Sequence, residues 1–100
     1  MFEGQKLVTR YLNESVLPDI QMILWGLVEE IRGKIKHDYL QVFDLSIENV
    51  QGIDVQVVKH TQERPRYKKI HRYLVVEPVK ARIFIIDSEE YCTMLFAEEY

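Results

Sequence analysis

Apolar side chains recur at helical spacing between residues 18 and 35. Seven of them fall within an arc of about 140° when successive residues are turned by about 100°, namely Ile20, Ile23, Leu24, Leu27, Val28, Ile31 and Ile35. The pattern predicts one long amphipathic helix whose apolar face packs on a core. Pro18 suits its first turn, where a missing N–H costs nothing, and Ser15 is a candidate N-cap. Gly33 and the polar residues 34–38 weaken the helix near its end.

From Tyr39 onward the apolar positions alternate with polar ones, which is typical of β-strands. We expect strands over 39–47, 53–62, 67–77, 81–87 and 91–98, after a short strand over 6–12 that precedes the helix. The residues expected to face the core include Phe43, Leu45, Ile47, Ile53, Val55, Val57, Ile70, Leu74 and Val76. Because the connections are short, strands that follow one another in sequence are expected to be neighbours in the sheet.

This order predicts an α+β fold in a single domain spanning residues 1–100. One long N-terminal helix would pack on a curved antiparallel sheet, as a strand, a helix and a five-stranded meander that form a roll. The segments 83–86 and 94–96 are apolar on both faces of their strands. Such strands need cover on both faces, so either the sheet curls on itself or a second copy or another partner covers the outer face.

The composition is that of an ordinary globular protein, with 47% hydrophobic and 29% charged residues. The net charge of −3 argues against a general nucleic-acid binder. The only cysteine, Cys92, cannot form an intramolecular disulfide. The N-terminus lacks the pattern of a signal peptide, and no apolar run reaches the roughly 18–20 residues of a membrane span. We therefore expect a cytoplasmic protein that does not bind membranes.

A basic segment is the most unusual local feature of the chain. Its candidate binding residues are Lys59, His60, Arg64, Arg66, Tyr67, Lys68, Lys69, His71 and Arg72. In one interpretation, this hairpin binds nucleic-acid phosphates or an acidic partner, with a tyrosine stacked on a base. In the other, it is a solvated edge that prevents pairing with other chains, or it neutralises the acidic strands beside it. Charge runs are more often solvated faces, which favours the second interpretation.

No group of residues has the pattern of a catalytic or metal site. His60 and His71 together supply at most half of a metal site, and no third ligand stands at a suitable spacing. Cys92 lies in an apolar segment with no histidine nearby, and the four glycines form no phosphate-binding loop. We expect neither enzymatic activity nor a bound cofactor.

A candidate apolar interface lies on the helix, at Pro18, Met22 and Trp25. Trp25 falls about 125° from the centre of the apolar arc, on the side away from the sheet. Exposed aromatic and methionine side chains are enriched at interfaces. In the alternative interpretation, the C-terminal residues 97–100 fold back over Trp25.

Five segments together resemble a known family. They are PDIQMILW, YLQVFDLS, HTQERPRYKK, ARIFIID and TMLFAEEY, which follow one another along the chain. They are similar to the small proteins of low-GC Gram-positive bacteria grouped as domain of unknown function number 960. The resemblance implies a bacterial stand-alone domain with a helix-on-sheet roll, and it assigns no role to any residue.

The element order has a weaker likeness to the cystatin fold, echoed by Gly4 and by the segments 18–21 and 56–58. Cystatins need a glycine two residues after the central valine of their inhibitory hairpin, where this chain has Lys59–His60. This likeness concerns the fold and does not extend to protease inhibition.

From these features we expect a non-enzymatic protein-interaction module that binds another protein or forms a homodimer. One alternative is binding of nucleic acid or an acidic partner through the basic hairpin 59–72. Another is a small-molecule site inside the curled sheet. Salt distinguishes the first two, because phosphate contacts weaken steeply as salt rises whereas apolar contacts do not.

Overall fold

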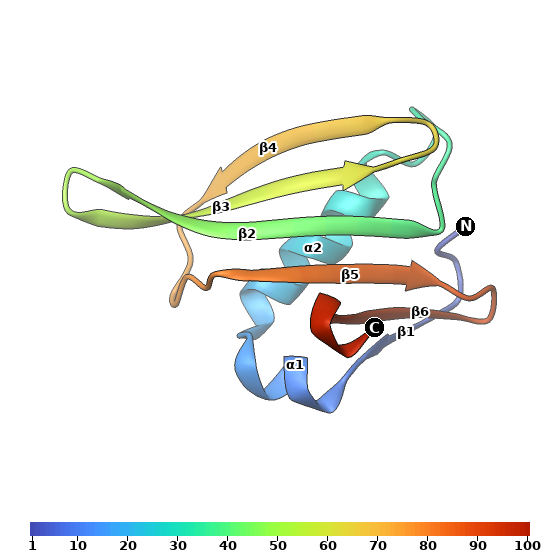
Figure 1. The fold of residues 1–100 in the computed structure, drawn as a ribbon, viewed down its shortest axis with the longest axis horizontal. Coiled ribbons are helices and arrows are strands. Elements are labelled where there is room, and N and C mark those ends of the chain that lie inside the picture. Colours follow the sequence, from blue (N-terminus) through green and yellow to red (C-terminus); the bar gives the residue numbers. More distant parts are fainter.

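A computed structural model describes residues 1–100 as a six-stranded sheet with helices packed on one of its faces (Figure 1). The elements, in chain order, are β1 (Gln5–Val8), α1 (Arg10–Ser15), α2 (Pro18–Glu30), β2 (Leu40–Val50), β3 (Ile53–Gln62), β4 (Tyr67–Tyr73), β5 (Ala81–Asp87), β6 (Tyr91–Phe96) and the 3₁₀ turn η1 (Ala97–Glu99). The mixed α+β class is confirmed. None of the helices has the length and apolar run that a membrane span requires.

The strand order in the sheet is β1-β6-β5-β2-β3-β4, antiparallel except where β1 runs parallel to β6. The predicted sequential meander is therefore wrong at one point, because β5 pairs with β2 and not with β4. The connection from β4 to β5 instead passes the start of α2, where the backbone N–H of Val76 donates to Asp19 Oδ2 at 3.2 Å. The buried Gln56 side chain bonds both the N–H and the carbonyl of Val79 in the same connection. The cystatin-like roll is not found.

The predicted strand over 6–12 is correct only as far as Val8. Thr9 then caps a short helix, since its hydroxyl accepts a hydrogen bond from the Leu12 N–H at 3.3 Å. Ser15 is not a cap but the last residue of that helix. Pro18 stands in the first turn of α2, as predicted.

The predicted single long helix is also wrong, since α2 has 13 residues and ends at Glu30. Gly33 follows with φ at +77°, a conformation that favours glycine and ends helices. The predicted apolar face is correct within these limits, because Ile20, Leu24, Leu27 and Val28 are the buried residues of α2.

The predicted core positions are correct for Phe43 and Leu45 of β2, and they are wrong for Ile47 and for the apolar residues named in β3 and β4. Phe43 and Leu45 are buried against α2, whereas Ile47 lies beyond the helix and is exposed. In β3 the buried positions are Gln56, Val58, His60 and Gln62, so Ile53, Val55 and Val57 face outward or lie exposed. In β4, Tyr67, His71 and Tyr73 turn toward the helix side, while Ile70, Leu74 and Val76 are exposed. Polar residues occupy inward positions in β3 because each finds a hydrogen-bond partner there.

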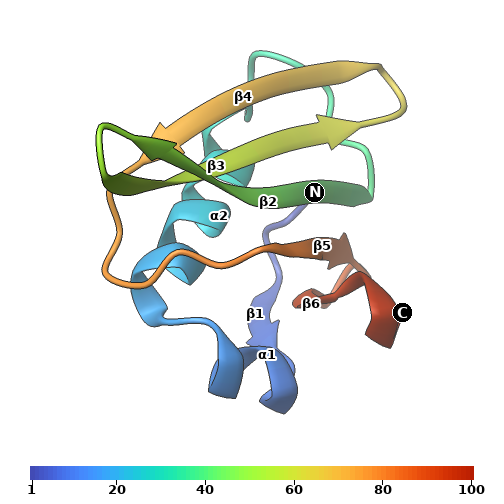
Figure 2. The same ribbon diagram turned by 60° about the vertical axis from the view of Figure 1, so that its left-hand side comes forward.

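The core lies between α2 and the inner face of the sheet. Its largest fully buried side chains are Phe43, Leu12, Ile20, Leu24, Ile83, Ile85 and Met94. The sheet stays open and does not curl on itself (Figure 2). Its outer face, opposite α2, is partly covered over β5 and β6 by η1, where the ring of Tyr100 contacts Phe84 edge-on at 5.8 Å.

Candidate interaction surfaces

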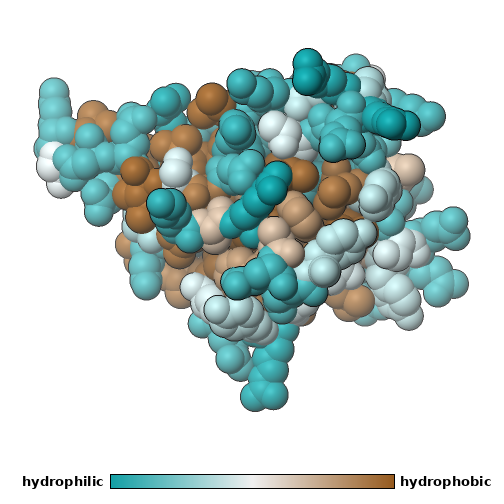
Figure 3. Space-filling model, viewed as in Figure 1, coloured by the Kyte–Doolittle hydropathy of each residue, from teal (hydrophilic) through white to brown (hydrophobic).

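The outer face of the sheet carries apolar side chains where a solvated antiparallel sheet usually carries polar ones. The strand register places Val42 beside Phe84 and Leu40 beside Ile86. We call these four residues the outer apolar strip, and each of them is partly exposed. Figure 3 shows hydrophobic atoms spread across this face and broken by hydrophilic side chains. The strip is therefore an apolar surface without a complete covering layer.

Charged side chains flank the strip on the same face. Asp44 lies opposite both Lys59 and Arg82 in the register, and its carboxylate pairs with Arg82 at 3.2 Å. Arg72 of β4 pairs with Glu48 of β2 at 3.4 Å, across the strand β3 that lies between them. Lys59 and Lys68 form no ion pair within the chain. The β3–β4 side of the outer face therefore keeps free positive charge.

The predicted basic segment does not form one patch. Strand alternation distributes its members: Lys59, Lys68 and Arg72 face outward, Arg64 and Arg66 lie in the turn, Tyr67, Lys69 and His71 turn to the helix side, and His60 is fully buried. The ring of Tyr67 is half-buried and packs edge-on against His60 at 5.2 Å. This aromatic side chain is therefore engaged inside the protein instead of standing free to stack on a base.

His60 belongs to a buried polar network that the sequence analysis missed. Its Nε2 lies 2.6 Å from Gln41 Oε1, and since an amide oxygen only accepts, Nε2 carries the proton. Gln41 in turn donates to Gln62 Oε1 at 2.6 Å, and Gln62 donates to the carbonyls of Lys36 and Pro65. The network ties the segment after α2 and the β3–β4 turn to the sheet. The only sequence signal for this network is the alternation of His60 and Gln62 in β3, together with Gln41 in β2.

The environment of the network keeps His60 neutral. Burial, followed by the neighbouring charges of His71 and His37, lowers the pKa of His60 to about 4. Burial also lowers the pKa of His71. His60 Nδ1 and His71 Nε2 are buried and have no hydrogen-bond partner. No three His, Cys, Asp or Glu side chains are arranged to hold a metal ion.

The predicted interface at Pro18, Met22 and Trp25 is only partly exposed. Met22 has 73% of its surface exposed and Pro18 is also exposed. Trp25 is half-buried against the core, and the ammonium of Lys6 lies 5.8 Å from its ring centre. The predicted exposure of Trp25 is therefore wrong. The alternative is wrong as well, because Tyr100 lies on the outer face of the sheet instead.

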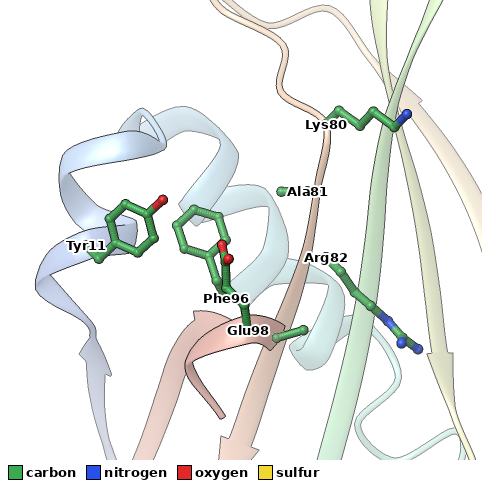
Figure 4. A pocket seen from close by; sticks show the side chains of 7 residues that line it. Tyr11, Lys80, Ala81, Arg82, Phe96 and Glu98 are labelled. Atoms are coloured by element: carbon green, nitrogen blue, oxygen red, sulfur yellow. The ribbon is translucent and has the colours of Figure 1, made fainter.

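A surface hollow of about 390 Å³ lies between α1, the start of β5 and η1. Its floor is formed by Tyr11 and Phe96, whose ring centres are 5.0 Å apart. In Figure 4 the charged ends of Lys80 and Arg82 point away from these rings. The hollow therefore has no set of polar groups directed at one point. The predicted small-molecule site inside a curled sheet is not found, because the sheet is open and core side chains fill the space under α2.

The thiol of Cys92 is fully buried in the core. Burial, as the largest cause, raises the pKa of this thiol. Because the thiolate is the nucleophilic form, a higher pKa makes Cys92 less reactive than an ordinary cysteine. Its place is that of a small core side chain.

Comparison with known proteins gives a family and a fold. Residues 5–99 match the model of a family described as a staphylococcal protein of unknown function, domain of unknown function number 960. The chain is also similar to a solved structure, described as a protein of unknown function from Enterococcus faecalis. The two are 19% identical, with a TM-score of 0.78 over 98% of this chain and 92% of that chain. At that identity the likeness shows the fold alone. No curated protein matches the chain.

Proposed function

We propose that this chain, which belongs to the staphylococcal family of unknown function that its sequence resembles, is a non-enzymatic protein-interaction module acting through the outer face of its sheet. The observation that carries the proposal is the outer apolar strip on strands β2 and β5, formed by Leu40, Val42, Phe84 and Ile86. Contiguous apolar surface of this kind on a soluble protein typically marks an interface.

Burying the outer apolar strip against a partner would contribute favourably to the free energy of binding. Covering apolar surface contributes about 25 cal/mol per Å², so each further 100 Å² buried contributes about 2.5 kcal/mol before the costs of association. The half-buried state of the four side chains leaves them packed in fixed positions by their neighbours in the sheet. A partner would therefore meet a surface that needs little ordering on binding.

The basic hairpin fits the rim of the proposed interface better than it fits a separate nucleic-acid-binding site. Arg72 and Arg82 are already paired with carboxylates, and Tyr67 packs against His60. Lys59 and Lys68 remain to steer an acidic partner toward the apolar strip. The proposal therefore assigns the lysines to orientation and the strip to affinity.

A capture experiment with matched variants tests this function. The chain is immobilised and exposed to a staphylococcal lysate and, separately, to purified untagged chain. We expect polypeptides that bind the wild type to be lost with Val42→Glu, which places a charge in the strip. They should be retained with Met22→Glu, which places the same charge on the exposed side of α2.

Both variants must show wild-type circular dichroism before they are compared. If the bound polypeptides are the same for wild type and Val42→Glu, the outer face is not the binding surface and the proposal fails.

A further inference from the structure

The outer face has opposite charges on its two sides. Lys59 and Lys68 stand unpaired on the β3–β4 side. On the other side, η1 projects over β5 and β6 and carries Glu98 and Glu99 (Figure 1). Glu99 is held in place by hydrogen bonds from the Phe96 N–H at 2.8 Å and the Thr9 hydroxyl at 2.9 Å. We call residues 97–100 the acidic ridge.

A hollow lies beside the acidic ridge on the same face. It has a volume of about 230 Å³. The apolar side chains of its lining are Tyr39, Leu40, Val42 and Phe84, and the polar ones are Asp38, Thr61, Gln62, Glu63 and Arg82. The ring of Tyr100 lies on Phe84, at the border between ridge and hollow. The face therefore has a raised acidic part and a depressed part lined by both apolar and charged side chains, with Lys59 and Lys68 beyond its edge. A surface with these two parts is complementary to itself when one copy is turned over onto another.

We propose, resting on the interaction function proposed above, that the occupant of the outer face is a second copy of this chain. The two sheets pack face to face about a two-fold axis that runs along the strands between β5 and β2. This axis divides the strand order β1-β6-β5-β2-β3-β4 into two sets of three strands. Each copy then presents β2, β3 and β4 to β5, β6 and β1 of the other, with η1 lying between the β6 of one copy and the β3 of the other.

The charges select this axis among the alternatives. An axis across the strands would place the lysine side of one copy on the lysine side of the other. An axis along β2 itself would bring the two copies of Asp44 together. The axis between β5 and β2 places the Asp44–Arg82 ion pair of one copy over the same pair of the partner subunit with opposite charges facing each other, because both residues stand in the same row of the register.

The same axis also brings complementary residues of the two copies together elsewhere on the outer face. Val42 lies over Phe84 of the partner subunit and the partner's Tyr100 that contacts it, since Val42 and Phe84 share a row. Leu40 lies over Ile86 of the partner subunit for the same reason. Lys68 approaches the partner's acidic ridge, because its row continues through Phe84 and Leu95 toward Thr9, which binds Glu99. Apolar contacts thus form the centre and charge pairs form the rim, as in typical interfaces.

The size of the face is sufficient for a dimer of modest affinity. The five longer strands, β2 to β6, are about 4.8 Å apart and rise about 3.3 Å per residue. Over seven residues, as in β4 and β5, they span about 550 Å² when the four-residue strand β1 is left out. The two copies together then bury about 1,100 Å², slightly above the roughly 1,000 Å² that a specific interface needs. We therefore expect a weak dimer that dissociates on dilution, since interfaces of this size are typical of transient complexes.

Sedimentation equilibrium from about 5 to 500 µM measures this directly. We expect the wild type to shift from monomer to dimer over that range, Val42→Glu to stay monomeric, and Met22→Glu to behave as wild type. Lys68→Glu and Glu98→Lys should each weaken dimerisation about 5-fold, since rim pairs contribute modestly, and the double variant should recover most of the loss.

A wild type that stays monomeric at every concentration overturns the second-copy inference. If such a chain still captures another polypeptide in a Val42-dependent manner, the interaction function stands with a different occupant, such as an acidic peptide. A dimer that Val42→Glu leaves intact overturns the proposed geometry. If neither self-association nor capture depends on Val42, the interaction function of this face fails as well.

Discussion

Acidification should destabilise this protein through His60 well before its carboxylates titrate. The pKa of His60 is lowered from its ordinary value of 6.5 to about 4, chiefly because the ring is buried. Between these two values the unfolded chain binds a proton at this position and the native protein does not. Stability is therefore complete above pH 6.5 and falls as the pH drops toward 4.

The loss of folding stability follows from the difference between the pKa values of His60 in the unfolded and native states. A difference of about 2.5 pH units, at about 1.4 kcal/mol per unit, gives a loss of roughly 3 kcal/mol by pH 4 and about 2 kcal/mol by pH 5. A small domain has a total stability of about 5–15 kcal/mol, so the loss is a large fraction. Between pH 6.5 and 5 ordinary carboxylates stay ionised, so the histidines are the side chains that titrate in this range.

Urea unfolding, followed by the fluorescence of the single Trp25, measures the effect at pH 7, 6.5, 6 and 5. His60→Gln keeps a donor for Gln41 but removes the titrating group, so its stability should be nearly flat from pH 6.5 to 5. His71→Gln is the matched control: burial lowers the pKa of His71 in the same direction, but this side chain is only half-buried and should account for less of the slope. Parallel pH curves for wild type and His60→Gln would refute the reasoning.

Three further predictions concern packing and backbone, each measured as the shift in the urea midpoint. Gly26→Ala should stabilise by about 1 kcal/mol, because the helix gains propensity and nothing lies within 4 Å of the added methyl group; a loss of stability would contradict the open surroundings. Gly4→Ala should destabilise by about 1–3 kcal/mol, since its Cβ would lie 2.5 Å from the Glu90 carbonyl oxygen; a neutral result would show that β1 moves freely. Phe43→Ala should cost about 3–5 kcal/mol as a fully buried aromatic, and a cost below about 1 kcal/mol would place it outside the core.

The candidate site illustrates which functional features sequence can reveal. The two-sided apolar character of residues 83–86 indicates an outer apolar face, and the structure places Phe84 and Ile86 on it. The basic segment indicates a charged surface, yet strand alternation separates Lys68 from Lys69 and buries His60. A linear run of charge is not a surface patch, because successive strand residues point to opposite faces.

The sequence alone determined part of the local structure of this protein, although it did not indicate α1 and it extended α2 beyond Glu30. The helical spacing of apolar residues identified the buried face of α2, and alternation with turn residues identified β3 and β5 within their observed limits. These features depend on neighbours within a few residues, so short segments carry the information.

Only the tertiary structure decided the order of the strands and the inward faces of β3 and β4. The β4–β5 connection is held by Asp19 and Gln56, which lie far from it in sequence, and this contact places β5 beside β2. Gln56 and His60 face inward because partners on other elements satisfy their polar atoms, although alternation by itself favoured the valines at the positions between them. A buried polar side chain is stable only when its partners are in place, and those partners come together only in the folded chain.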